Sequence, residues 1–100
     1  MTEMPENFDS DKVHTFTLEV SNKMGIHARP AAMIVRITSR YNGEIWIKKD
    51  DEKINAKSIM GIMMLAAAKG TRLQFESTSD ESAEFEKEMT ELFISRFQDE

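Results

Sequence analysis

Strand gives way to helix within MGIHARPA, residues 24–31 of the chain. Gly25 permits a tight backbone bend ahead of the helix. Pro30 is tolerated in the first turn because the first N–H groups of a helix have no intrahelical partner. Apolar residues then recur at helical spacing as far as Tyr41. We therefore predict a helix that begins at Ala28, with His27 as its N-cap.

The segments on either side of this run alternate between strand and helix patterns. Alternating apolar residues predict short strands over residues 14–20, 44–49, 52–55 and 71–77. Amphipathic or apolar spacing predicts helices over 28–41, 58–68 and 80–97. Thr78 and Glu81 have the spacing of a capping box at the start of the last helix. The order β-α-β-β-α-β-α predicts an α+β open-faced sandwich, a four-stranded antiparallel sheet with three helices on one face.

Composition limits the classes of protein to which the chain can belong. One hundred residues make one domain, which we expect over residues 13–100 after a polar, acidic and disordered leader over residues 1–12. No apolar run reaches membrane-spanning length and there is no cysteine, so we expect a cytoplasmic protein that does not insert into membranes. The net charge of −5 argues against nucleic acid as a partner. No cluster of His or Cys predicts a metal site, and we expect no cofactor.

His27 lies where a phosphoryl group could be held. The first N–H groups of the helix, those of Ala28, Arg29 and Ala31, are expected to point toward its side chain, and the helix dipole favours an anion there. Arg29 adds a cation that can bind phosphate oxygens, and a neutral imidazole is a nucleophile near pH 7. The alternative is a surface histidine that merely caps a helix. The other histidine, His14, is expected to be structural or solvent-facing, with no charged neighbours of interest.

The second unusual segment is KSIMGIMML, residues 57–65. Ser58 is a good N-cap for the helix that follows, and phosphate on Ser58 would be electrostatically compatible with a helix start. That helix is apolar on nearly every side, so part of it must remain exposed and could serve as an adaptable contact surface. We assign Ile62 and Leu65 to the core. The alternatives are that Ser58 is a plain N-cap and that the remaining apolar residues are ordinary core.

The two segments together resemble the HPr family, the histidine phosphocarriers of the bacterial phosphoenolpyruvate-dependent phosphotransferase system. Residues 25–31 (GIHARPA) are similar to the active-site motif of that family, and residues 57–61 (KSIMG) to its regulatory serine motif. The resemblance extends from about residue 14 to residue 91. Two motifs at their expected separation are far more specific than one.

The resemblance implies a function for each motif. His27 would accept a phosphoryl group on Nδ1 from phosphorylated enzyme I and pass it to an enzyme IIA domain, with Arg29 binding the phosphate. Ser58 would be the target of the HPr kinase/phosphorylase. The chain would then be a monomeric carrier for sugar uptake and not an enzyme. The shared docking face would consist of Met33, Arg36, Ile59, Met60, Met63 and Met64.

Some residues depart from the family pattern and leave alternatives open. Met24 stands where many members of sugar systems have a small polar residue, and Ser79 where a glycine is common. The C-terminal helix is similar to that of nitrogen-type paralogues, which would make the chain a regulatory phosphorelay not tied to sugar uptake. A second alternative is a binding module that acts through phosphorylated Ser58 on an enzyme or a transcription regulator. A third is an unrelated interaction domain of the same topology.

Overall fold

The computed structural model describes residues 13–98, and the predicted leader, residues 1–12, lies outside the described residues. A four-stranded antiparallel sheet has the order β1-β4-β2-β3. Its strands are β1 (His14–Glu19), β2 (Ile45–Lys49), β3 (Glu52–Asn55) and β4 (Arg72–Ser77). The helices are α2 (Ala28–Thr38), α3 (Ile59–Met64) and α4 (Ser82–Ile94), followed by the short segment η1 (Arg96–Gln98). The predicted fold class is confirmed.

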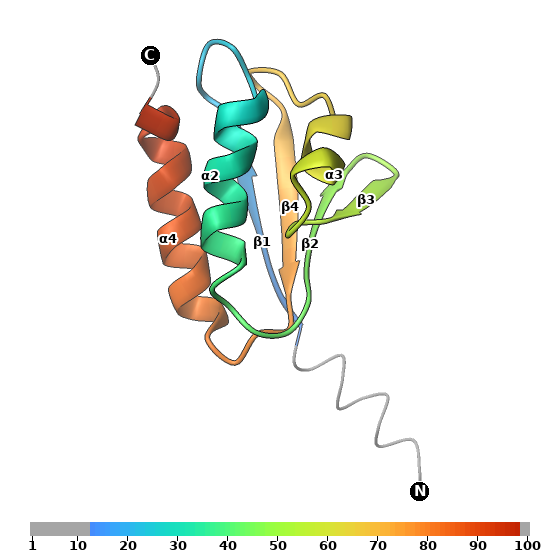
Figure 1. Ribbon diagram of the computed structural model, residues 1–100, viewed down its shortest axis with the longest axis vertical. Coiled ribbons are helices and arrows are strands. Elements are labelled where there is room, and N and C mark those ends of the chain that lie inside the picture. Colours follow the sequence, from blue (N-terminus) through green and yellow to red (C-terminus); the bar gives the residue numbers. More distant parts are fainter. Residues whose placement is uncertain (1–12, 99–100) are drawn as a thin grey trace, which may run out of the picture.

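All three helices lie on the same face of the sheet (Figure 1). Helices α2 and α4 run side by side across β1 and β4, and the shorter α3 lies beside α2 toward β3 (Figure 1). The central strand β4 aligns Phe75 with Phe16 of β1 and with Ile47 of β2. These three side chains point toward the helices and are buried, because alternate residues of a strand face the same side of a sheet.

Aromatic side chains join the sheet to α4. Phe16 and Phe75 stack with ring centroids 5.0 Å apart, and Phe85 of α4 meets Phe75 edge-on at 6.1 Å. Phe93 contacts Phe75 at 5.8 Å and Phe97 at 4.9 Å. Burial of each such side chain contributes roughly 1.5–3 kcal/mol to folding. The cluster thereby holds α4 and η1 against β1 and β4 of the sheet.

Helix α3 ends earlier than predicted. Its last residue is Met64, and Ala66 takes a left-handed φ of 50° where the sequence suggested helix to residue 68. Three successive alanines are strong helix formers, but tertiary contacts override that preference. Ala67 is buried, and its carbonyl accepts a hydrogen bond from the N–H of Ile26 at 2.9 Å.

Helix α4 begins and ends inside its predicted range of 80–97. The hydrogen bonds at its start differ from those predicted. The predicted capping box is wrong: the Thr78 hydroxyl accepts from the N–H of Glu44 at 2.9 Å. The Ser79 hydroxyl instead accepts from the N–H of Glu81 at 3.1 Å. The turn before α4 is thus fixed by contacts with neighbouring loops, which a local sequence pattern does not reveal.

His14 is structural and partly solvent-facing, as predicted, and it has a charged partner that its neighbours in the sequence do not reveal. Its Nε2 lies 2.7 Å from Oε1 of Glu86, so strand β1 is tied to helix α4 by a half-exposed pair. These residues are 72 positions apart in the sequence. No periodicity within either segment could have predicted that pairing.

Tyr41, Glu88 and Arg40 form a polar cluster that ties the end of α2 to α4. The Tyr41 hydroxyl donates to Oε1 of Glu88, and Nη2 of Arg40 donates to Oε2 at 3.0 Å. Burial and then the bond to Glu88 raise the pKa of Tyr41 to about 12. The hydrogen bond from Tyr41, followed by that from Arg40, lowers the pKa of Glu88. The cluster therefore favours a neutral phenol beside an ionised carboxylate.

The variant Tyr41→Phe should lower the free energy of unfolding by about 1 kcal/mol near pH 7, because it removes one hydrogen bond to a charged group. Glu88 has a folded pKa below its unfolded value, so its contribution is complete above the unfolded pKa and is lost as pH falls through the folded pKa. The contribution of Tyr41 is complete below about pH 10 and is lost as pH rises toward its folded pKa of about 12.

Urea unfolding monitored by the fluorescence of Trp46, the single tryptophan of the chain, measures this difference as a function of pH. We expect the difference in free energy of unfolding between wild type and variant to be constant at intermediate pH and to become smaller at both low and high pH. A difference that is independent of pH would contradict the coupling between Tyr41 and Glu88.

Candidate functional site

The turn that carries His27 is fixed by its backbone. The N–H of Ile26 donates to the carbonyl of Ala67 at 2.9 Å, and Nδ2 of the fully buried Asn22 donates to the carbonyl of Gly25 at 2.8 Å. Gly25 has φ of 74°, and a Cβ there would lie 2.6 Å from the Ala67 carbonyl oxygen. Only glycine meets both demands, a left-handed backbone and direct contact with another segment.

His27 is the N-cap of α2, as predicted, with φ of −99° and ψ of −164°. Its side chain makes no capping bond, so the ring is not used to satisfy the helix start. The expectation for Ala31 is wrong, because its N–H donates to the His27 carbonyl at 3.0 Å and opens the helical ladder. Since Pro30 has no N–H, the first-turn groups outside that ladder are those of Ala28 and Arg29.

One ring nitrogen of His27 is shielded from solvent. The residue is half-buried, and its Nε2 atom is buried. The exposed part of the side chain therefore excludes Nε2. That Nδ1 accepts a phosphoryl group stays a prediction from the resemblance.

Arg29 lies in the first turn of α2 and is held from two sides. Its Nη2 donates to the carbonyl of Phe97 at 3.2 Å, and its Nη1 lies 3.5 Å from Sδ of Met33. A neutral carbonyl and a thioether sulfur are weaker acceptors than a phosphoryl oxygen, so a phosphoryl group would compete for the guanidinium. Phe97 belongs to η1, whose three residues all have φ between 56° and 58°. This left-handed turn brings its carbonyl to Arg29.

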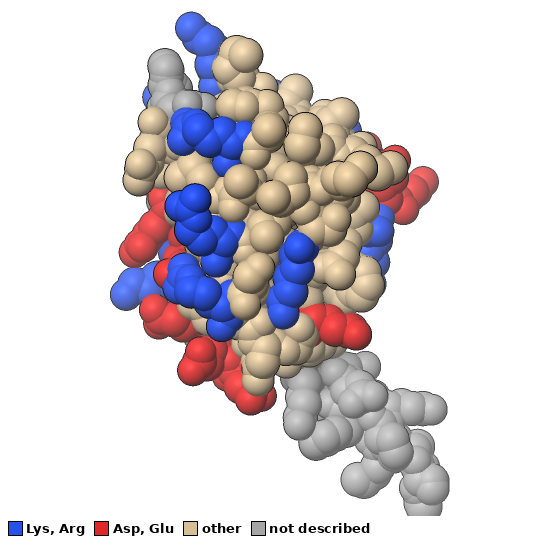
Figure 2. Space-filling model, in the orientation of Figure 1, with Lys and Arg blue, Asp and Glu red and all other residues tan. Residues whose placement is uncertain are grey.

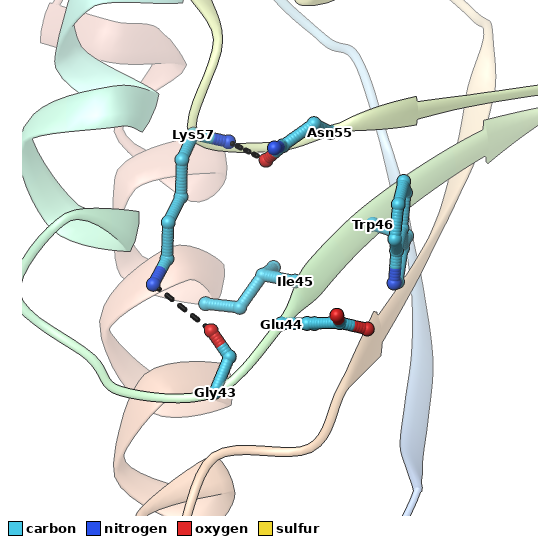
Figure 3. A pocket seen from close by; sticks show the side chains of 6 residues that line it. All are labelled: Gly43, Glu44, Ile45, Trp46, Asn55 and Lys57. Carbon is cyan, nitrogen blue, oxygen red and sulfur yellow. Dashed lines mark hydrogen bonds between the residues drawn. The ribbon is translucent and has the colours of Figure 1, made fainter.

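Ser58 is the N-cap of α3, as predicted, and its hydroxyl oxygen accepts from the N–H of Gly61 at 2.9 Å. The preceding Lys57 is anchored by Nζ bonds to the carbonyls of Tyr41 at 2.7 Å and Gly43 at 3.0 Å. The Lys57 N–H also donates to Oδ1 of Asn55 (Figure 3). These contacts, beside a small pocket of about 130 Å³, fix the backbone at Ser58 while its side chain stays half-exposed.

The surface of α3 is apolar and exposed, as expected. Ile62 and Leu65 are buried and attach the segment to the core. The predicted docking residues Ile59, Met60, Met63 and Met64 are exposed, and so is Arg36 of α2, whereas Met33 is half-buried against the core. Figure 2 shows an uncharged area over α3 next to basic side chains that follow α2 and the turn after it.

The two motifs lie at opposite ends of α3. The His27 turn contacts the segment after α3 through Ile26 and Ala67. The other end of α2 is tied to the segment before Ser58, where the Thr38 hydroxyl donates to the carbonyl of Ala56 at 2.8 Å. Helices α2 and α3 lie side by side (Figure 1), and His27 and Ser58 are their respective N-caps.

One contact at the site could not be predicted from the sequence. The Phe97 carbonyl reaches Arg29 across 68 positions of sequence, and no local signal predicts such a contact. Among residues 13–98, no three His, Cys, Asp or Glu side chains gather in a way that could hold a metal ion. No helix in that range is long and apolar enough to cross a membrane.

Comparison with known proteins agrees with this geometry. A family model described as "PTS HPr component phosphorylation site" matches residues 14–95. The chain is 41% identical over 81 residues to the phosphocarrier protein HPr of Neisseria meningitidis, covering 81% of this chain and 91% of the relative. It is 41% identical over 83 residues to the HPr-like protein Crh of Bacillus subtilis, covering 83% and 93%. A crystal structure of HPr from Thermoanaerobacter tengcongensis aligns with a TM-score of 0.81 at 41% identity, over 87% of this chain and 98% of that one.

Substitution of Gly25 should test how tightly the His27 turn is held. Gly25→Ala combines a left-handed backbone with a close approach to Ala67, and we expect a loss of about 2–4 kcal/mol in stability. Gly70→Ala is the matched control: Gly70 has φ of 95°, but a Cβ there would meet nothing within 4 Å. We expect it to cost only about 1 kcal/mol. Urea unfolding monitored by Trp46 fluorescence compares the two variants, and equal losses would contradict the close packing at Gly25.

Proposed function

We propose, from the premise that this chain belongs to the HPr family, that His27 is its phosphoryl acceptor and Arg29 its phosphate ligand. Nδ1 of His27 would attack the phosphorus of the phosphoryl group that enzyme I carries. The new N–P bond forms as the bond between phosphorus and enzyme I breaks, and the electron pair of that bond stays with enzyme I. A second transfer, with His27 as the donor, would pass the phosphoryl group to an enzyme IIA domain. The chain then acts as a stoichiometric carrier in the phosphotransferase system.

The observation that supports this proposal most strongly is the placement of the His27 ring. It stands at the N-terminus of α2 without capping it, half-exposed, with Nε2 buried. A phosphoryl group on Nδ1 would lie near the N–H groups of the first helical turn, where the helix dipole stabilises negative charge. Arg29 lies in the same turn, and its guanidinium can exchange a carbonyl for a phosphoryl oxygen. The helix N-terminus and Arg29 together therefore supply the positive potential that a bound phosphoryl group needs.

Docking would use the apolar face of α3 together with the basic edge of α2. Ile59, Met60, Met63 and Met64 supply exposed apolar area, which gains free energy when a partner covers it. Arg29, Arg36 and Arg40 are exposed along α2 and the turn after it. A partner with an acidic rim around an apolar patch would fit this surface, and we assign enzyme I and enzyme IIA domains to it.

Incubation with phosphoenolpyruvate and enzyme I should phosphorylate the wild-type protein and His14→Ala, but not His27→Ala. His14 is the matched control because it is the only other histidine and is paired with Glu86 on a different part of the fold. The product should be acid-labile and base-stable, as a phosphoramidate is. Mass spectrometry at neutral pH would report one phosphate per chain. Equal labelling of His27→Ala and wild type would overturn the assignment.

We further propose that Ser58 is phosphorylated by an HPr kinase/phosphorylase and that this modification acts through docking. The six residues of α3 rise about 9 Å between the two motifs. Two phosphates of about −2 charge each that lie about 10 Å apart in water repel by roughly 1.7 kcal/mol, and screening by physiological salt reduces this to roughly 0.5 kcal/mol. Direct repulsion between the two phosphates is therefore weak. A charge beside Ile59 and Met60, by contrast, would have to be desolvated when a partner covers that face.

The variant Ser58→Asp should raise the KM of enzyme I for this protein by about tenfold or more, the effect of one poorly solvated charge at an interface. The spontaneous hydrolysis rate of phosphorylated His27 should not change. Thr17→Asp is the matched control, since Thr17 is exposed on the uncovered face of the sheet. It adds the same charge away from α3 and should leave KM unaltered. An equal rise in KM for both variants, or a changed hydrolysis rate in Ser58→Asp alone, would contradict action through docking.

A second candidate function is regulation through Ser58 without sugar uptake. The similarity to the HPr-like protein Crh over 83 residues favours it, and a transcription regulator would then be a partner. In that case Ser58→Ala would abolish the regulatory output while His27→Ala would leave it intact. A phosphorelay of the nitrogen type would require His27 and dispense with Ser58, so the same two variants separate the alternatives.

A further inference from the structure

The exposed side chains of α3 include thioethers with unusual access to solvent. Met60 is 74% exposed and Met64 73%, whereas Met89 in α4 is fully buried. Met60 and Met64 are four residues apart on one helix and therefore lie on the same face. The chain has eight methionines and no cysteine, so no thiol of its own competes for an oxidant. Oxidation of methionine follows exposure.

We propose that Met60 and Met64 form a reversible oxidation site that regulates docking at α3, an inference that rests on the proposed function of that face. The oxidant is a peroxide. The thioether sulfur attacks one peroxide oxygen, the O–O bond breaks, and the products are a sulfoxide and water. Sulfur loses two electrons and the peroxide gains them. A thiol-dependent methionine sulfoxide reductase would reverse the change.

Oxidation at these positions should alter docking and leave the fold intact. The side chains that hold α3 to the core are Ile62 and Leu65, each 1% exposed. Met60 and Met64 lie outside that contact, so a sulfoxide there stays hydrated in the free protein. In a complex the S=O group would be covered, and covering a polar group without a hydrogen-bond partner is costly. The two oxidation states therefore differ in affinity and not in folding.

The test treats the full-length protein with dilute hydrogen peroxide and follows each methionine by peptide mass spectrometry. Met60 and Met64 should oxidise roughly tenfold or more faster than Met89. The KM of enzyme I for the oxidised protein should rise by about tenfold or more, equivalent to about 1.4 kcal/mol for each factor of ten. Sulfoxide reductase should restore the original KM. Circular dichroism should not change between the two states.

A double variant, Met60→Leu with Met64→Leu, separates this site from every other oxidisable group. Leucine keeps the apolar surface and the approximate volume but has no sulfur, so the KM of this variant, whatever its value before treatment, should be the same after peroxide. The single variant Met24→Leu is the matched control, because Met24 is 73% exposed outside α3. It should remain sensitive to peroxide.

Each outcome of this experiment decides one of the two ideas. Failure of enzyme I to phosphorylate the untreated protein would overturn the proposed function. Normal phosphorylation before treatment, with an unchanged KM after Met60 and Met64 are oxidised, would overturn the oxidation site alone. The same loss in the double leucine variant as in wild type would also overturn it, since the sensitive group would then lie elsewhere.

Discussion

The turn that carries His27 depends on one backbone hydrogen bond. The N–H of Ile26 donates to the carbonyl of Ala67 at 2.9 Å, and this places the turn before α2 against the segment after α3. The bond restricts the sequence at the turn, because residue 25 must be glycine: any Cβ there would collide with that carbonyl. Helix α3 has already ended where the chain reaches this contact, since Ala66 takes a left-handed φ of 50°.

The brevity of α3 explains why so much of its apolar surface is exposed. A six-residue helix presents fewer than two turns, and Ile62 and Leu65 use the side that faces the core. Isolated helices of this length are not stable in water, so α3 depends on those two buried residues and on the Ser58 cap. The exposed positions of α3 are not needed to pack the helix against the core. Methionine suits such positions because its flexible, polarisable side chain adapts to more than one partner, and its sulfur is what makes the same surface open to oxidation.

Sequence reasoning succeeded where the determining forces are local. The strand order along the chain, the start of α2 at Ala28 and the N-caps His27 and Ser58 follow from periodicity, glycine and capping preferences. It failed where a contact spans a long stretch of sequence. The pairing of His14 with Glu86, the approach of Phe97 to Arg29 and the use of Thr78 by Glu44 join residues 34 to 72 positions apart. Such contacts depend on packing, which leaves no periodic trace in either segment.

The charge on the surface of α2 and α3 differs in sign from the net charge of the whole chain. The net charge of −5 argues against nucleic acid, but it does not describe the surface that a protein partner would contact. Acidic residues gather on α4 and at the turn between β2 and β3, whereas Arg29, Arg36 and Arg40 follow α2. At physiological salt, charges interact over about 8 Å. A partner seated on α2 and α3 would therefore experience the arginines nearby far more than the carboxylates elsewhere. Local charge would then steer association at this face.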